Sequence, residues 1–164
     1  MVKKVAFFPG SFKPPHVGHY TLVKKLLPKV DELYIFISGK PRDGITAEQS
    51  LKIWHLYFQS KTDMKKITFQ VTEESPILTV YKAIPKLSSK DTIYLIKSSK
   101  NASNKRFDMF KRLKYNIIDW TLPSFKTISS TNMREAIKND DYESFKKFFP
   151  PPVDAKAVWK IVQN

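Results

Sequence analysis

The chain of 164 residues contains no cysteine, only four glycines and only three histidines. Without cysteine it can form no disulfide, offers no thiolate nucleophile and builds no cysteine-ligated zinc site. No apolar run approaches the ~18 residues of a membrane-spanning helix. The N-terminal apolar run, residues 5–8, is also too short for the hydrophobic region of a secretory signal. These absences predict a cytoplasmic protein without membrane insertion.

Acidic residues are scarce as well, with 15 Asp and Glu against 29 Lys and Arg, which gives a net charge of +14. A charge of this size informs about partners rather than about the fold. It is compatible with nucleic acid, an anionic membrane or a small polyphosphate ligand, and equally with a lysine-rich solvated surface. The proportions of apolar residues (41%) and charged residues (27%) are near the globular average, so we expect a buried core.

Short apolar runs alternate with segments of helical periodicity along the whole chain. We predict strands at residues 4–8, 33–38, 67–71, 92–96 and 115–118, and helices at 17–30, from 46 onward, 76–87, 132–138, 142–148 and 154–162, with weaker helical periodicity over 101–113. This alternation predicts an α/β protein with a Rossmann-like, doubly wound parallel sheet of about five strands. We expect one domain over residues 1–149 and a C-terminal helical extension over residues 150–164, which opens on three prolines.

The loop after the first predicted strand, residues 10–19, holds two of the four glycines and two of the three histidines. His16 and His19 are three residues apart, so one helical turn places both rings on the same side. Gly10 lets the backbone turn, and Gly18 leaves room for a ligand to approach. Such sheets bind ligands beyond the carboxyl ends of their strands, and a helix N-terminus favours phosphate. The loop is therefore a candidate phosphate site, although a His at this position also suits a helix cap. Neither cysteine nor a nearby carboxylate offers a third metal ligand, so no metal site is predicted here.

A second group of polar residues precedes a predicted helix near the other end of the chain. Ser129, Ser130 and Thr131 offer hydroxyl groups at a helix start, where capping residues belong. Arg134 follows about one turn later, and its planar guanidinium matches phosphate oxygens better than lysine does. Taken alone, these residues fit a simple helix cap as well as a phosphate clamp.

Together the two segments resemble the signatures of a known family. Gly10-Ser11-Phe12 followed by His16-Val17-Gly18-His19, and Ile128-Ser129-Ser130-Thr131-Asn132-Met133-Arg134, are similar to the nucleotide-binding motifs of the nucleotidylyltransferase superfamily. That superfamily includes the adenylyltransferases acting on nicotinamide mononucleotide and phosphopantetheine, and the cytidylyltransferases. The resemblance spans roughly residues 4–136. The second motif is closer to the adenylyl branch, which favours ATP, while CTP with a polyol or sugar phosphate stays open.

The resemblance implies that an acceptor phosphate attacks the α-phosphorus of a nucleotide and that pyrophosphate leaves, with Mg²⁺ carried by the triphosphate. It implies His16, His19, Lys13 and Arg134 as catalytic groups, although many relatives have Asp or Asn at position 13. The implied nucleotide-binding residues are Gly10, Ser11, Phe12, His16, Gly18, His19, Ser129, Ser130, Thr131 and Arg134.

Acceptor specificity is the least determined property. The resemblance implies phosphate contacts from the basic residues Lys40, Arg42 and Lys97. The loop after Ile96 lacks the glycine-bearing stretch common in the family, which leaves open a member that binds nucleotide without turnover. The densely basic stretch 97–114 also leaves open a function of another class, a non-catalytic nucleic-acid-binding domain. A homo-oligomer is possible, since relatives often assemble.

Overall fold

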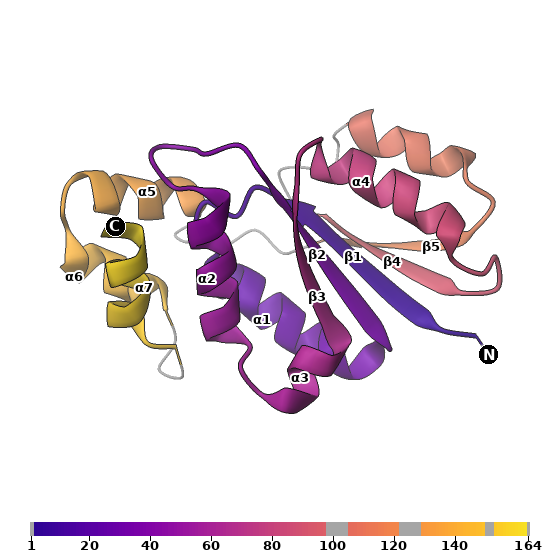
Figure 1. The fold of residues 1–164 in the computed structure, drawn as a ribbon, viewed down its shortest axis with the longest axis horizontal. Coiled ribbons are helices and arrows are strands. Elements are labelled where there is room, and N and C mark those ends of the chain that lie inside the picture. Colours follow the sequence, from indigo (N-terminus) through magenta and orange to yellow (C-terminus); the bar gives the residue numbers. More distant parts are fainter. Residues whose placement is uncertain (1, 98–104, 122–128, 150–152, 164) are drawn as a thin grey trace.

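A single sheet of five parallel strands runs through the protein, with helices packed on both of its faces (Figure 1). The computed structural model describes residues 2–97, 105–121, 129–149 and 153–163. The strands are β1 (Lys4–Gly10), β2 (Glu32–Ser38), β3 (Ile67–Thr72), β4 (Thr92–Lys97) and β5 (Asn116–Thr121), in the spatial order β3-β2-β1-β4-β5. The predicted doubly wound parallel sheet of about five strands is confirmed.

The central strand β1 pairs with β2 on one side and with β4 on the other. Its side chains alternate between two buried clusters, because Ala6 and Phe8 face one layer of helices while Val5 and Phe7 face the other. Burial on both faces explains why this strand is a continuous apolar run rather than an alternating one. Since β2 and β4 lie on opposite sides of β1, the chain winds in two directions from it. The crevice at such a switch point is the usual ligand site of this fold.

Seven α-helices are present in the described part of the chain: α1 (Val17–Leu26), α2 (Ala47–Tyr57), α3 (Lys61–Lys66), α4 (Pro76–Ala83), α5 (Ser130–Lys138), α6 (Tyr142–Phe145) and α7 (Ala155–Gln163). Buried side chains of α1, α2 and α5–α7 join one core cluster, and those of α4 join the other. A 3₁₀ segment, Lys105–Arg112, also covers the α4 face through Phe107 and Phe110.

Two predicted helices end at prolines, and a third, predicted over 142–148, is α-helical only to Phe145 and continues as a 3₁₀ turn to Phe148. The helix predicted over residues 17–30, which Pro28 was expected to end, stops at Leu26 and is followed by the 3₁₀ turn Leu27–Lys29 that contains this proline. The helix predicted over 76–87 ends at Ala83 and is followed by the 3₁₀ turn Ile84–Lys86, which contains Pro85. A proline lacks the N–H that a continuing α-helix would use and clashes with the preceding turn. The helix α3 was not predicted, because none of its residues is buried and it shows no apolar stripe.

The C-terminal helix α7 packs against the main body of the protein. Val158 and Val162 are buried in the same cluster as the α1 and α2 side chains. The Gln49 side chain on α2 donates a hydrogen bond to the Ile161 carbonyl at 3.0 Å. The prolines 150–152, at which we expected an extension to begin, lie outside the described residues. None of the helices described is long and apolar enough to cross a bilayer.

Candidate active site

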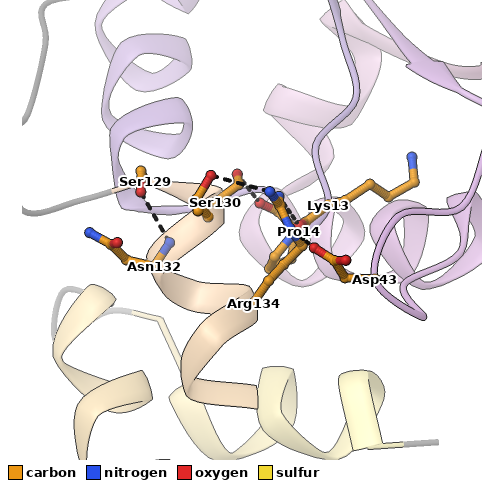
Figure 2. A network of polar contacts seen from close by, with 8 residues as sticks. Lys13, Pro14, Asp43, Ser129, Ser130, Asn132 and Arg134 are labelled. Carbon is orange, nitrogen blue, oxygen red and sulfur yellow. Dashed lines mark hydrogen bonds and ion pairs between the residues drawn. The ribbon is translucent and has the colours of Figure 1, made fainter. Parts of the chain in front are cut away.

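The two motifs meet at the carboxyl end of β1, although they are far apart in the sequence. The loop after β1 leads into α1, and the start of α5 lies against this loop (Figure 2). The Ser130 hydroxyl donates a hydrogen bond to the Pro14 carbonyl at 2.9 Å, and Arg134 Nη1 donates to the Lys13 carbonyl at 2.9 Å. The loop after β1 and the start of α5, which the sequence indicated as two separate candidate phosphate sites, therefore lie in one site.

The histidine pair begins α1 and caps it. His16 Nδ1 accepts a hydrogen bond from the Gly18 N–H at 3.0 Å, and His19 Nδ1 accepts one from the His16 N–H at 3.0 Å. The two rings stack with centroids 3.7 Å apart. Because both Nδ1 atoms accept, each ring carries a proton on Nε2. A histidine that caps the helix can therefore also bind phosphate, because the capping bond uses Nδ1 and leaves the Nε2–H to act as a donor.

His19 is a neutral hydrogen-bond donor at neutral pH. Burial lowers its pKa well below the usual value, and the neighbouring His16 lowers it further. A buried cation would lack solvation, so the ring stays uncharged while its tautomer is fixed by the capping bond. The Nε2–H of His19 can stabilise an anionic oxygen without giving up its proton.

Phe12 also packs against His19 through its ring. Its backbone is left-handed, with φ at 52°, and its ring packs edge-on against Phe8, His19 and Trp54 at centroid distances of 4.9, 5.0 and 5.1 Å. The Ser50 hydroxyl on α2 donates to the Phe12 carbonyl. Phe12 was expected to bind nucleotide, and this stays a prediction; the residue is 4% exposed and its ring packs on His19.

Gly10 is required because the Phe12 ring folds back over it. A Cβ on Gly10 would lie 2.7 Å from Phe12 Cζ, well inside van der Waals contact. We expect Gly10→Ala to lower the free energy of unfolding by about 1–3 kcal/mol, the usual cost of overpacking a filled core. Urea denaturation measures this directly. The double variant Gly10→Ala/Phe12→Leu should lose less than the sum of the two single losses, and an unchanged stability of Gly10→Ala would contradict the packing described.

Lys13 is buried with its ammonium group between two backbone carbonyls. Its Nζ donates to the Ser11 carbonyl at 2.6 Å and to the Ser38 carbonyl at 2.8 Å, and the residue has no exposed surface. These bonds tie the loop after β1 to the carboxyl end of β2. Burial lowers the pKa of Lys13 to about 8. At pH 7 the group is therefore still largely protonated and adds positive charge to the site.

The lowered pKa of Lys13 predicts a pH-dependent stability. Between pH 8 and the ordinary lysine pKa of 10.5, the unfolded chain holds a proton that the folded chain has released, so folding is favoured more as the pH rises. The free energy of unfolding of the wild type, relative to Lys13→Met, should rise across this window by up to a few kcal/mol, at about 1.4 kcal/mol per pKa unit. Urea denaturation at pH 7.5 and 10 tests this. A difference that does not change with pH would show that Lys13 titrates normally.

Arg134 joins three segments of the site. Its Nε donates to Asp43 Oδ2 at 2.7 Å, its Nη1 to the Lys13 carbonyl and its Nη2 to Thr131 Oγ1 at 3.2 Å. Only 7% of the side chain is exposed. Ser129 caps α5 by accepting the Asn132 N–H at 3.1 Å. The helix cap is thus present, and the arginine one turn later reaches back to the first motif.

The three basic residues expected to contact the acceptor lie at the same edge of the sheet. Lys40 and Arg42 follow β2 and are exposed. Lys97 ends β4, where its ammonium forms an ion pair with Asp119 on β5 at 3.2 Å and lies 4.7 Å from the Phe107 ring centroid. Lys97 is therefore directed to β5 and Phe107. Ile128 of the second motif and the loop residues 98–101 lie outside the described residues.

Three residues that shape the site were not identified from the sequence. Asp43 pairs with Arg134, Ser50 binds the Phe12 carbonyl, and the buried Tyr57 hydroxyl donates to the Pro15 carbonyl at 2.8 Å. Ser50 could have been identified from the sequence, since it is a polar residue on the buried face of an amphipathic helix. Within the described ranges no three His, Asp or Glu side chains gather into a metal-ligand cluster.

The sequence of the chain matches a known family and its relatives. A family model described as cytidylyltransferase-like matches residues 7–136. The phosphopantetheine adenylyltransferase of Mycoplasma capricolum is 24% identical over 140 residues, covering 80% of this chain and 95% of that protein. A probable nicotinate-nucleotide adenylyltransferase of a Nitratiruptor species is 26% identical over 178 residues, covering 98% of this chain and 99% of that protein.

The fold is also found among solved structures. A bifunctional NMN adenylyltransferase/ADP ribose pyrophosphatase of Francisella tularensis, complexed with AMP and a manganese ion, superposes with a TM-score of 0.70 at 15% identity. The match covers 99% of this chain and 50% of that protein. The chain thus spans about half the length of this bifunctional protein, and the likeness is one of fold.

Proposed function

The chain belongs to the cytidylyltransferase-like family, and from this premise we propose that it transfers AMP from ATP to the phosphate of a small-molecule acceptor and releases pyrophosphate. The observation that carries the proposal is the junction of the two motifs, in which Arg134 binds the loop that positions His19. ATP is preferred to CTP because the relatives that match over most of their length are named as adenylyltransferases. Transfer of CMP from CTP is the alternative within the family.

The reaction needs no general base from the protein. A phosphate monoester has a second pKa near ~6 and is already an anionic nucleophile at neutral pH. One of its oxygens forms a bond to the α-phosphorus, the bond from that phosphorus to the oxygen bridging to the β-phosphate breaks, and pyrophosphate takes the electron pair. Charge builds up on the α-phosphoryl oxygens, where His19 Nε2–H donates a hydrogen bond, with His16 stacked beside it. Catalysis then consists of positioning and charge stabilisation.

The leaving pyrophosphate is assigned to the second motif. The N-terminus of α5 offers N–H groups and the positive end of the helix dipole, and the Arg134 guanidinium, which is paired with Asp43, adds further N–H donors. The protonated ammonium of Lys13 raises the positive potential around the loop after β1. The substrate is taken to be the magnesium complex of ATP, because Mg²⁺ is usually bound through substrate phosphates and water. Donors and cations, rather than carboxylate ligands, dominate the protein side of the site.

The acceptor is proposed to place its phosphate near the exposed residues Lys40 and Arg42, at the carboxyl end of β2. Lys97 is a weaker candidate, because Asp119 already compensates its charge. Which phosphate ester is used stays open between nicotinate or nicotinamide mononucleotide, phosphopantetheine and other phosphates. The cytoplasmic location, a homo-oligomer and the boundary at residue 149 remain predictions from the sequence.

A pyrophosphate-release assay tests the proposal. MgATP and MgCTP are each combined with nicotinate mononucleotide, nicotinamide mononucleotide, phosphopantetheine, flavin mononucleotide, glycerol phosphate and sugar phosphates. We expect turnover with ATP and one acceptor class. If no pair reacts and the protein instead binds nucleic acid with an affinity that falls steeply with salt, the enzymatic proposal is wrong and the basic stretch 97–114 becomes the functional surface.

A further inference from the structure

We propose that Asp43 is a positioning residue for nucleotide binding, which acts by holding the Arg134 guanidinium in the orientation that receives phosphate. The inference rests on the proposed function, because it assigns Arg134 to the triphosphate. Asp43 lies in the loop between β2 and α2, outside both motifs. It contacts Arg134 from the side opposite to the start of α5 (Figure 2).

The contact is short and charged on both sides. Asp43 Oδ2 lies 2.7 Å from Arg134 Nε, at the short end of the range for charge-assisted hydrogen bonds. The arginine side chain is 7% exposed, whereas the aspartate side chain is 43% exposed. A guanidinium so far from solvent needs compensating partners, and Asp43 is its carboxylate partner among the described residues.

The N–H groups of Arg134 that make no contact among the described residues are available to a ligand. A guanidinium has five N–H groups in a fixed fork. In the described part of the chain three are engaged, one each by the Asp43 carboxylate, the Lys13 carbonyl and the Thr131 hydroxyl. One N–H remains on each terminal nitrogen, and we assign these donors to phosphate oxygens. Because Nε is held from one side, rotation of the fork away from this orientation would break a charged hydrogen bond.

The backbone of the loop places the carboxylate. Asp43 has φ at 49° and Gly44 has φ at 80°, so two consecutive residues are left-handed. The turn is closed by reciprocal backbone hydrogen bonds between Arg42 and Ile45, each 2.9 Å long. Aspartate is among the few residues with a Cβ that adopt this conformation readily. An acidic side chain is therefore fixed at the tip of a turn that otherwise carries the basic residues Lys40 and Arg42.

Substitution of Asp43 by Asn tests the proposal, since Asn keeps the shape and tolerates the left-handed backbone but loses the charge. We expect Asp43→Asn to weaken MgATP binding about tenfold or more, the usual value of a hydrogen bond between charged groups. The rise should appear in the KM for ATP more than in kcat, and Asp43→Glu should recover part of it. In the background of Arg134→Lys the substitution should have little further effect, because the group that Asp43 positions is gone. Asp108→Asn is the matched control, since it removes an exposed carboxylate that pairs with Lys111 at 3.5 Å.

Two readouts separate this inference from the proposed function. Equilibrium titration with MgATP measures affinity whether or not any acceptor turns over. The Arg134 Nε–H resonance in a ¹⁵N–¹H spectrum should be shifted and slow to exchange in the wild type and lose both properties in Asp43→Asn. Tighter MgATP binding by Asp43→Asn would overturn the proposal, because Asp43 would then compete with phosphate for Arg134. Unchanged binding would overturn it as well.

Discussion

Alanine in place of His19 is expected to lower the rate of pyrophosphate formation by about 10²–10³-fold, the usual cost of one donor to a developing oxyanion. The ring is held neutral by burial and its proton is held on Nε2 by the bond from the His16 N–H. That donor strengthens its bond as charge moves onto the α-phosphoryl oxygens. The loss should therefore appear mainly in kcat, with a smaller change in the KM for ATP.

Two variants make the His19 experiment specific. His55 is the third histidine, lies exposed on α2 outside the site, and His55→Ala should keep wild-type activity. His19→Gln places an N–H donor near the former Nε2 and should keep more activity than His19→Ala. A loss of less than about threefold in His19→Ala, with the fold intact by circular dichroism, would remove His19 from the reaction.

Replacing Trp54 with alanine should lower the free energy of unfolding by about 3–5 kcal/mol, as is typical when a buried aromatic side chain is truncated. Trp54 has no exposed surface and packs against Phe12 at 5.1 Å, Phe69 at 5.9 Å and Phe58 at 6.0 Å between ring centroids. The cavity left behind would lie beneath Phe12, which supports His19. Catalytic activity should fall with stability, even though Trp54 belongs to neither motif.

Trp54→Phe is the matched control for this substitution. The indole Nε1 is buried and has no hydrogen-bond partner within the described structure. Phenylalanine removes this unsatisfied donor, which offsets part of the cost of the smaller ring, so we expect a loss well below that of Trp54→Ala. Chemical denaturation of the three proteins measures both values. A loss below about 1 kcal/mol for Trp54→Ala would contradict the packing described.

The centre of the sheet could be predicted from the sequence because β1, β2 and β4 are buried on both faces, whereas the edge strands β3 and β5 are largely exposed. Strands buried on both faces are continuous apolar runs, and the runs at 33–38 and 92–96 lie within β2 and β4. The start of α1 at Val17 was predicted, and α5 begins at Ser130, two residues earlier than predicted, because Ser129 caps it. Local signals of this kind need no knowledge of distant contacts.

Contacts between distant segments could not be predicted in the same way. Asp43 follows Arg42 in a polar loop, and nothing local distinguishes it from other loop carboxylates, although it is 91 residues from its partner Arg134. Lys13 was recognised as a departure from the family pattern, but its bond to the Ser38 carbonyl depends on the pairing of β1 with β2. Phe12 was assigned to the nucleotide from its place in the motif, which does not indicate that its ring packs on His19 and Trp54.

The most direct test of the central claim follows the phosphate label. ATP labelled with ³²P at the α-phosphate or at the γ-phosphate is incubated with magnesium, the protein and the acceptor that supports pyrophosphate release. Attack at the α-phosphorus predicts that the α-label enters the acceptor product while the γ-label is recovered in pyrophosphate. Recovery of the γ-label in the acceptor would show phosphoryl transfer at the γ-phosphorus instead, and would contradict the account.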